Sequence, residues 1–300
     1  MKTKGVGCLL LLIGVPLILA TLVFAFSEFQ LRRVYAIPLT ELSIPADELS
    51  LARGKFLVEA IGACGECHGG YLLNGNRNFL HEPLIGVVPA ANLTAGKGGI
   101  GTIYTAADWE RAIRHGVGRD GRALMGVSSG ALQHLSDADV GAMVAYLQTI
   151  APFDNELPPR QIGPLARPFL FFAFILPEEE NDIMPAVKIN HAAPHLADVE
   201  PGVTVEYGRY LVNLTCVECH KVDLGGGANP GEGMNITTGG NLGGWTEAEF
   251  IHALKSGITP EGNSLNDSEM PQARLRHLSE DELKAIWLYV QSVPPVTMEK

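Results

Sequence analysis

The chain has 300 residues, of which 46% are hydrophobic and 18% charged, and it contains five cysteines. This composition excludes a disordered chain and a coiled coil, and the length is sufficient for two compact domains. The formal net charge of −11 argues against nucleic acid as a partner, because its phosphates are also negative. Five cysteines are few and odd in number, which argues against a disulfide scaffold.

An uncharged, mostly apolar segment occupies residues 5–26. As a helix, its 22 residues would be about 33 Å long, close to the thickness of the hydrocarbon core of a bilayer. A cleaved signal peptide is the alternative, because Val23, Phe24 and Ala25 form an acceptable cleavage site. The segment is longer than the usual signal core and lacks a polar stretch before that site, so we favour a retained transmembrane anchor.

The charges on the two sides of this segment bear on its orientation. Lys2 and Lys4 precede it and favour a cytoplasmic N-terminus, whereas Arg32 and Arg33 follow it and weaken that argument. We predict a single-pass protein of the cytoplasmic membrane whose soluble part lies on the periplasmic side.

The chain also repeats itself at an offset of about 143 residues. Residues 134–148 match residues 277–291, and residues 105–116 match residues 246–257. Each matched segment has a capping serine or threonine near its start, followed by apolar residues at helical spacing. The pattern therefore predicts two amphipathic helices in each copy.

The caps of the later helix differ slightly between the copies. Ser279 is followed three residues later by Glu282, which predicts a capping box. Ser136 is followed in the same way by Asp139, which predicts an aspartate variant of that box.

These elements predict an all-α fold. Two tandem units are expected at residues 46–155 and 201–300, behind the transmembrane helix, and alternation typical of strands is scarce. The intervening residues 156–200 are predicted to be a semi-rigid linker, because nine of the 19 prolines fall within residues 152–201.

The linker contains an apolar segment at residues 169–176. A helix of this length measures about 12 Å and cannot span a bilayer. Burial between the units, insertion into the membrane interface and contact with a partner subunit all remain open.

Two Cys-x-x-Cys-His motifs occupy equivalent points of the repeat. Residues three apart lie on one face of a helix, so both thiols of a motif can form thioethers to one haem. The histidine at the next position can then supply a nitrogen to the iron as the proximal ligand. The sequence therefore predicts two covalently bound haem c groups, and export from the cytoplasm agrees with it. The motif residues are Cys64, Cys67, His68, Cys216, Cys219 and His220.

Two other readings of the motifs are weaker. Four thiolates could form a structural zinc site, but that leaves the histidine after each pair unexplained and joins pairs from different copies. A redox-active dithiol would be expected in a βαβ context, which the sequence does not indicate.

With these motifs the chain resembles class I c-type cytochromes. It is more closely similar to the di- and multihaem cytochromes that serve as membrane-anchored electron-transfer subunits of bacterial respiratory dehydrogenases. The resemblance covers most of residues 50–155 and 203–295. It rests on the two haem motifs and their preceding Gly-x-aromatic-Leu, on an Asn-x-Thr in each copy (from Asn92 and from Asn235), on the segment 244–250, and on the closing helices.

The resemblance implies a close helix crossing in each unit. The first and last helices are expected to cross at Gly54 in one unit and at Gly208 in the other. The aromatic residues expected near these crossings are Phe56, Tyr146, Tyr210 and Tyr289.

The resemblance also implies a distal methionine ligand from the loop before the last helix. In the second unit Met270 precedes a proline, 50 residues after His220 and eight before Leu278. We therefore predict Met270 as the distal ligand there.

The distal ligand of the first unit is less clear. The position that matches Met270 is Val127, and Met125 lies two residues upstream; we predict Met125 as the ligand. Met143 falls on the apolar stripe of the last helix and is expected in the core. His115 and His134 are weaker ligand candidates, expected at the polar surface.

This ligand set indicates an electron carrier and not an enzyme. Methionine raises the reduction potential of a haem, and iron held from both sides has no position for substrate. The resemblance implies a dehydrogenase or quinol-oxidising complex as donor and an oxidase or small soluble cytochrome as acceptor. The alternative is a dihaem enzyme, peroxidase-like or thiosulfate-oxidising, with an open haem in the first unit.

Overall fold

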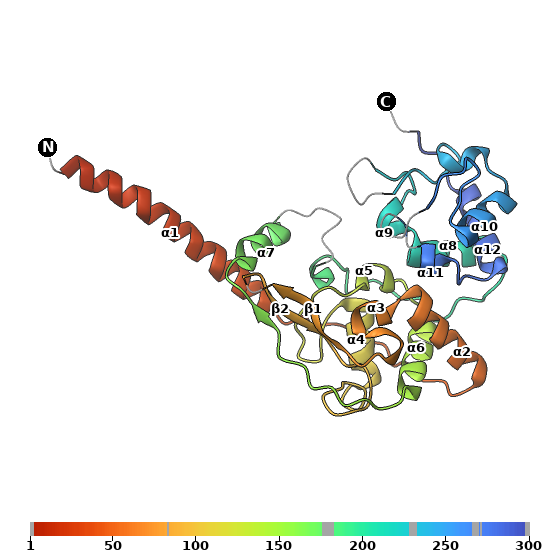
Figure 1. The fold of residues 1–300 in the computed structure, drawn as a ribbon, viewed down its shortest axis with the longest axis horizontal. Helices are drawn as coiled ribbons and strands as arrows, with labels where there is room; N and C mark the ends of the chain where they lie inside the picture. Colours follow the sequence, from red (N-terminus) through yellow and green to blue (C-terminus); the bar gives the residue numbers. More distant parts are fainter. Residues whose placement is uncertain are drawn as a thin grey trace.

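The structure is a computed structural model, and it describes residues 3–82, 84–175, 183–227, 233–265, 270 and 272–297. Helix α1 (Thr3–Arg32) projects from a body made of two mainly helical parts (Figure 1). Within the described residues, the segment Leu12–Arg32 of α1 is the one helix long and apolar enough to cross a membrane. Such a helix near the N-terminus fits both an anchor and a signal sequence.

The first part of the body carries two long helices that pack together, with shorter elements between them. Helix α2 runs directly into the single π-helical turn η1 before the first Cys-x-x-Cys-His motif. Its elements are α2 (Glu48–Phe56), η1 (Leu57–Ile61), α3 (Cys64–His68), η2 (Gly70–Leu72), β1 (Asn76–Glu82), β2 (Gly86–Ala90), α4 (Ala106–His115), α5 (Ser129–Leu132) and α6 (Asp137–Thr149).

The second part repeats this order without the strands among its described residues. Its elements are α8 (Val205–Thr215), α9 (Val217–His220), η4 (Asn241–Gly244), α10 (Glu247–Ser256), α11 (Gln272–Leu275) and α12 (Glu280–Ser292). Between the two parts lie β3 (Gln161–Ile162), α7 (Ala166–Ile175) and η3 (Pro185–Val187).

The helix crossings that the resemblance implies are confirmed. A Cβ atom placed on Gly54 of α2 would lie 2.0 Å from the backbone oxygen of Ala142 in α6. On Gly208 of α8 it would lie 1.9 Å from the backbone oxygen of Ala285 in α12. Only glycine lets the backbones approach this closely, so these two positions fix how the first and last helices of each unit pack.

The helix caps agree with the sequence in all but one case. Thr105, Thr246 and Ser279 each begin a helix with a complete capping box. Ser136 accepts a hydrogen bond from the backbone N–H of Asp139, but the predicted return bond of the aspartate variant is wrong. The Asp139 carboxylate is instead taken up by Arg53 and Tyr210, whose hydrogen bonds it accepts.

The prediction of an all-α fold is incomplete, because the first part contains a small antiparallel sheet of strands β1, β2 and β3. Strand β1 pairs with β2 in a hairpin, and β2 pairs with β3 from the segment between the units. Burial does alternate along β2, but five residues that include a proline are too few to show a clear strand period in the sequence.

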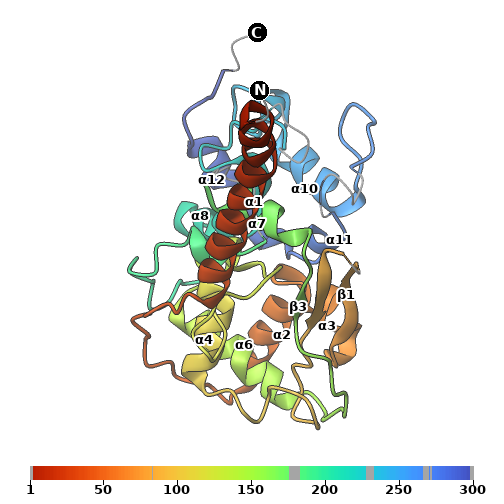
Figure 2. The ribbon, with the colours of Figure 1, turned by 90° about the vertical axis from the view of Figure 1, so that its left-hand side faces the viewer.

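The segment between the units is attached to the first unit and to α1, as both views show (Figures 1 and 2). Helix α7 packs on α1, with the rings of Phe171 and Phe26 at a centroid distance of 5.2 Å. Leu170 is buried, whereas Phe169 and Phe172 remain exposed. Of the apolar segment at residues 169–176, one side therefore packs on α1, and Leu176 lies outside the described residues.

Replacing Gly54 by alanine tests the helix crossing. Because the added methyl group has no space beside Ala142, Gly54→Ala is expected to lower the free energy of unfolding by about 1–3 kcal/mol or more. Denaturant titration followed by circular dichroism measures it. Gly244→Ala is the control, since a Cβ there meets no atom within 4 Å. Equal stability of the two variants would contradict the crossing.

Candidate functional site

Both Cys-x-x-Cys-His motifs lie in a short helix that follows the first long helix of a unit. The first motif forms α3, and the second begins at Cys216 and continues as α9. In the first unit the change of direction occurs at Ala63, whose φ of 43° is left-handed. The four motif cysteines are partly buried. The predicted helical placement of the motifs is confirmed.

The histidine of each motif is held by one hydrogen bond to a backbone carbonyl. His68 Nδ1 lies 2.7 Å from the oxygen of Ala91, and His220 Nδ1 lies 2.6 Å from the oxygen of Met234. A carbonyl only accepts, so Nδ1 of each ring carries the proton and Nε2 keeps its lone pair. Each imidazole is therefore oriented and protonated as a metal ligand requires.

An Asn-x-Thr turn directly after each of these carbonyls fixes the acceptor in place. In the first unit, Asn92 Oδ1 accepts hydrogen bonds from the backbone N–H and the hydroxyl of Thr94, at 3.0 and 2.8 Å. Asn92 Nδ2 donates to the backbone oxygen of Phe153 at 2.8 Å, just beyond the last helix of the unit. Both side chains are fully buried.

The second unit repeats the same bonds at residues 143 positions later. Asn235 binds Thr237 in the same way, and its Nδ2 lies 2.6 Å from the backbone oxygen of Val296. The backbone N–H of Val296 donates in turn to Thr237 Oγ1 at 3.0 Å. The two sites are thus built to one plan.

Burial keeps the site residues in their neutral forms. Loss of solvation lowers the pKa of His68 and of His220, so both imidazoles are neutral at neutral pH. It raises the pKa of Cys64 to about 12 and that of Cys216 to about 11. Both thiols are therefore protonated at neutral pH.

A polar network joins the two units. Arg53 of α2 holds Asp139 through two hydrogen bonds of 2.9 and 2.8 Å, and donates to the Tyr207 hydroxyl of α8 at 3.0 Å. Tyr210 donates to the same Asp139 carboxylate at 2.6 Å, and Glu282 lies 3.5 Å from Arg53. Hydrogen bonds to Asp139 raise the pKa of Arg53, against the lowering caused by burial.

A second contact reaches the first motif itself. Arg274 of α11 forms an ion pair with Glu66, which lies between Cys64 and Cys67. Conversely, α5 of the first unit contacts α8 and α9 of the second unit, and α9 carries the second motif. Each motif is therefore contacted by the short helix that precedes the last helix of the other unit.

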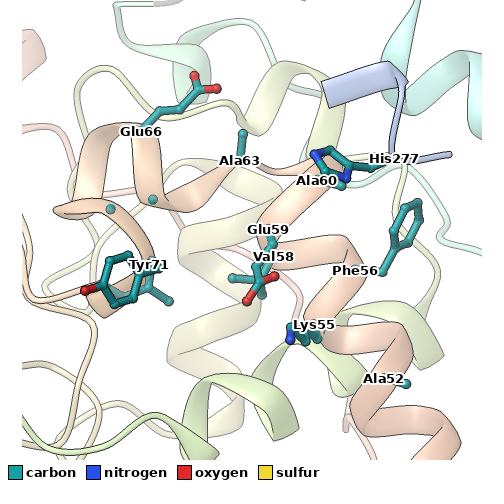
Figure 3. Close-up of a pocket in the computed structure, with 13 residues that line it drawn as sticks. Ala52, Lys55, Phe56, Val58, Glu59, Ala60, Ala63, Glu66, Tyr71 and His277 are labelled. Carbon is teal, nitrogen blue, oxygen red and sulfur yellow. The ribbon is translucent and has the colours of Figure 1, made fainter. Parts of the chain in front are cut away.

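A cleft of about 690 Å³ lies beside the first motif (Figure 3). Its lining includes Phe56, Glu59, Glu66 and Tyr71 of the first unit and His277 of the second. Of the first motif, Gly65 and Glu66 line the cleft, whereas the side chains of Cys64, Cys67 and His68 do not.

The predicted distal ligands lie in different surroundings. Met270 packs against the main hydrophobic core, as does Cys216 of its own motif. Met125 packs against a second cluster that contains Tyr35 and Val117. Met143 is buried in the core, as predicted.

The two candidate histidines, His115 and His134, differ in burial. His134 is exposed, as expected. The prediction of a surface position for His115 is wrong, because its side chain is fully buried. The reason is a contact with the segment between the units, where His191 packs against its ring.

Sequence reasoning missed two features of the site. The carbonyls that orient the histidines are backbone groups and leave no mark in the sequence, although the Asn-x-Thr after each was a usable signal. The network around Arg53 joins residues more than 80 positions apart in the chain, and nothing in their spacing indicates it.

Comparison with known proteins agrees with this geometry. The family described as cytochrome c oxidase, cbb3-type, subunit III matches residues 204–290. The fructose dehydrogenase cytochrome subunit of Gluconobacter japonicus is 28% identical over 87% of this chain and 56% of its own length. A diheme cytochrome c-type protein of Cereibacter sphaeroides is 27% identical over 82% of this chain and 86% of its own length.

The chain is a c-type cytochrome. It is related to the cytochrome c subunits of bacterial membrane dehydrogenases and is a homologue of a dihaem cytochrome c. The alcohol dehydrogenase (quinone) cytochrome c subunit of Gluconobacter oxydans is also 28% identical, over 84% of this chain. The cytochrome spans little more than half the length of the two dehydrogenase subunits.

The motif residues fit haem c. Cys64 and Cys216 are protonated thiols, and each motif histidine presents Nε2 with its lone pair. Once a thioether forms, the motif helix and the carbonyl acceptor hold the imidazole from two directions.

Replacing Asn235 tests the support of the second histidine. Asn235→Ala leaves the carbonyl of Val296 and the polar groups of Thr237 without their partner, so the free energy of unfolding is expected to fall by about 1–3 kcal/mol. The absorption spectrum of the bound haem should shift as well. Asn78→Ala, at an exposed asparagine, is the control and should change neither. An unchanged Asn235→Ala protein would contradict this role.

Proposed function

We propose that the cytochrome is a membrane-tethered electron-transfer subunit that carries two haem c groups and is not itself an enzyme. His68 and His220 serve as proximal ligands, and Met125 and Met270 as distal ligands. The observation that carries the proposal is the duplicated arrangement in which each motif histidine donates Nδ1–H to a carbonyl held by an Asn-x-Thr turn.

The residues of each unit have separate tasks in this proposal. Haem c supplies a one-electron couple that needs no substrate at the iron. The two thiols fix its position covalently, and the carbonyl acceptor keeps the imidazole in one tautomer and increases its basicity. The buried surroundings exclude water from the imidazole, which keeps the histidine unprotonated.

A dehydrogenase complex is the environment that the relatives suggest. Several of them are named as cytochrome subunits of fructose, alcohol and gluconate dehydrogenases. We propose that this chain accepts electrons from a dehydrogenase or quinol-oxidising complex and passes them to an oxidase or a small cytochrome. Helix α1 would hold it in the cytoplasmic membrane, with both units on the periplasmic side.

The haem content tests the proposal directly. The full chain is expected to carry two covalent haems, measured by mass spectrometry and by the pyridine haemochrome. The double variant Cys216→Ser/Cys219→Ser should carry one, because its second motif can form no thioether. Cys8→Ser, outside both motifs, should keep two. A full chain with fewer than two haems would end the proposal.

A dihaem enzyme, peroxidase-like or thiosulfate-oxidising, is the second candidate. The observation that favours it is that Met125 packs against the second cluster, whereas Cys64 packs against the main core. A haem of the first unit without that ligand would leave a coordination position for substrate.

Carbon monoxide separates the two candidates. A carrier with both methionine ligands should not bind the gas rapidly in its reduced state. Met270→Ala should bind it and lose the second haem's contribution to the weak far-red band of methionine-ligated ferric haem, whereas Met143→Leu, in the core, should do neither. Rapid binding to one haem of the unaltered protein would favour the enzyme.

A further inference from the structure

Three potential metal ligands lie close together where α4 of the first unit contacts the segment between the units, outside the haem motifs. Glu110 and His115 belong to α4, and His195 belongs to the segment that leads to the second unit. One ligand atom from each lies within 4.8 Å of the other two. Glu110 and His115 are fully buried, and His195 is partly buried.

Among the described residues, Nε2 of His115 has no hydrogen-bond partner. His191 Nε2 lies 3.0 Å from the carbonyl of Ala186, so this nitrogen is a donor. Burial lowers the pKa of His191, which leaves a neutral ring whose Nδ1 accepts. His115 Nδ1 lies 3.1 Å from that Nδ1 and must be the donor. His115 Nε2 is therefore a buried lone pair that no group in the structure satisfies.

This arrangement is the one in which proteins present histidine to a metal ion. A ligating histidine usually donates its second N–H to an acceptor, which fixes its tautomer. His191 plays that part for His115. Burial and the neighbouring histidines lower the pKa of His115 to about 4, so a proton does not compete for its lone pair at neutral pH.

The surrounding charges permit a cation although Arg114 lies nearby. Arg114 pairs with Glu110 at 3.0 Å and with Asp137 at 2.7 Å, so the three groups together carry one negative charge. Glu110 also accepts from the backbone N–H of Thr40 at 3.0 Å. A carboxylate has about four lone-pair sites, so Glu110 can still contribute one to a metal ion.

We propose that Glu110, His115 and His195 bind one divalent transition-metal ion of the zinc class. Two imidazole nitrogens and one carboxylate oxygen are a ligand set that suits Zn²⁺, with a fourth position for water. His191 is a positioning residue that orients His115. The ion joins the C-terminal end of α4 to the segment between the units, and so limits how that segment can move. No electron or bond transfer is involved.

Zinc binding to the haem-loaded full chain in detergent tests the site. After treatment with a chelator, the protein is dialysed against Zn²⁺ and analysed for zinc, with haem iron as the internal standard. The unaltered chain is expected to bind one zinc. His191→Ala should remove the positioning group and weaken binding by about 10–100-fold, and His195→Gln, which removes a ligand, should weaken it at least as much. His252→Gln, at an exposed histidine of α10, should bind as the unaltered chain does.

A measurement on the unaltered protein covers the case in which a variant does not fold. The zinc X-ray absorption spectrum should show nitrogen and oxygen ligands, including two imidazoles, and zinc should raise the unfolding temperature. No bound zinc, a spectrum without imidazole, or zinc retained at full affinity by His195→Gln would overturn the proposal. None of these readings depends on electron transfer, so this site can fail while the proposed function stands.

Discussion

The hydrogen bond from each motif histidine to a backbone carbonyl is the constraint on which the site depends. The acceptors, on Ala91 and Met234, have no rotatable side chain and can move only with their loops. Those loops are tied by Asn92 and Asn235 to the chain just after the last helix of each unit. Since that helix is placed by its crossing with the first helix, the orientation of the imidazole traces back to the two crossing glycines.

The residues that join the two units occupy equivalent positions of the repeat. Arg53 and Tyr207 each precede a crossing glycine, and Asp139 and Glu282 are equivalent positions of the repeat. The surfaces are therefore close to a self-complementary pair, as in a two-fold dimer. Arg53 breaks this symmetry, because its counterpart in the second unit is a tyrosine. Arg53 binds the carboxylates of both units. A single cation thus holds together two equivalent acidic positions that would otherwise repel each other.

The sequence predicted the parts of the fold that follow from local rules and from the repeat. Helix caps at Thr105, Thr246 and Ser279 and the haem motifs were all readable, since each depends on residues within five positions. The hairpin of β1 and β2 was missed because its strands are short and depend on pairing for their stability. Burial of His115 was missed because a residue 76 positions away covers it, and helical periodicity reports only on the helix itself.

The repeat also shows where the two units have diverged. Both units have the hydrogen bond from the motif histidine to a carbonyl, the Asn-x-Thr turn and the crossing glycine. The motif histidine is therefore held in the same way in each unit. The surroundings of Met125 and Met270 differ, because Met125 packs against the cluster that contains Leu31 of α1 and Leu170 of α7, whereas Met270 packs against the main core. The hydrogen bond from Nδ1 to a carbonyl raises the basicity of both motif histidines alike, so it does not distinguish the two sites. Under the proposed ligand set, the two sites differ on the methionine side, and in the first unit Met125 packs against the cluster that contains Leu31, near the end of the N-terminal helix.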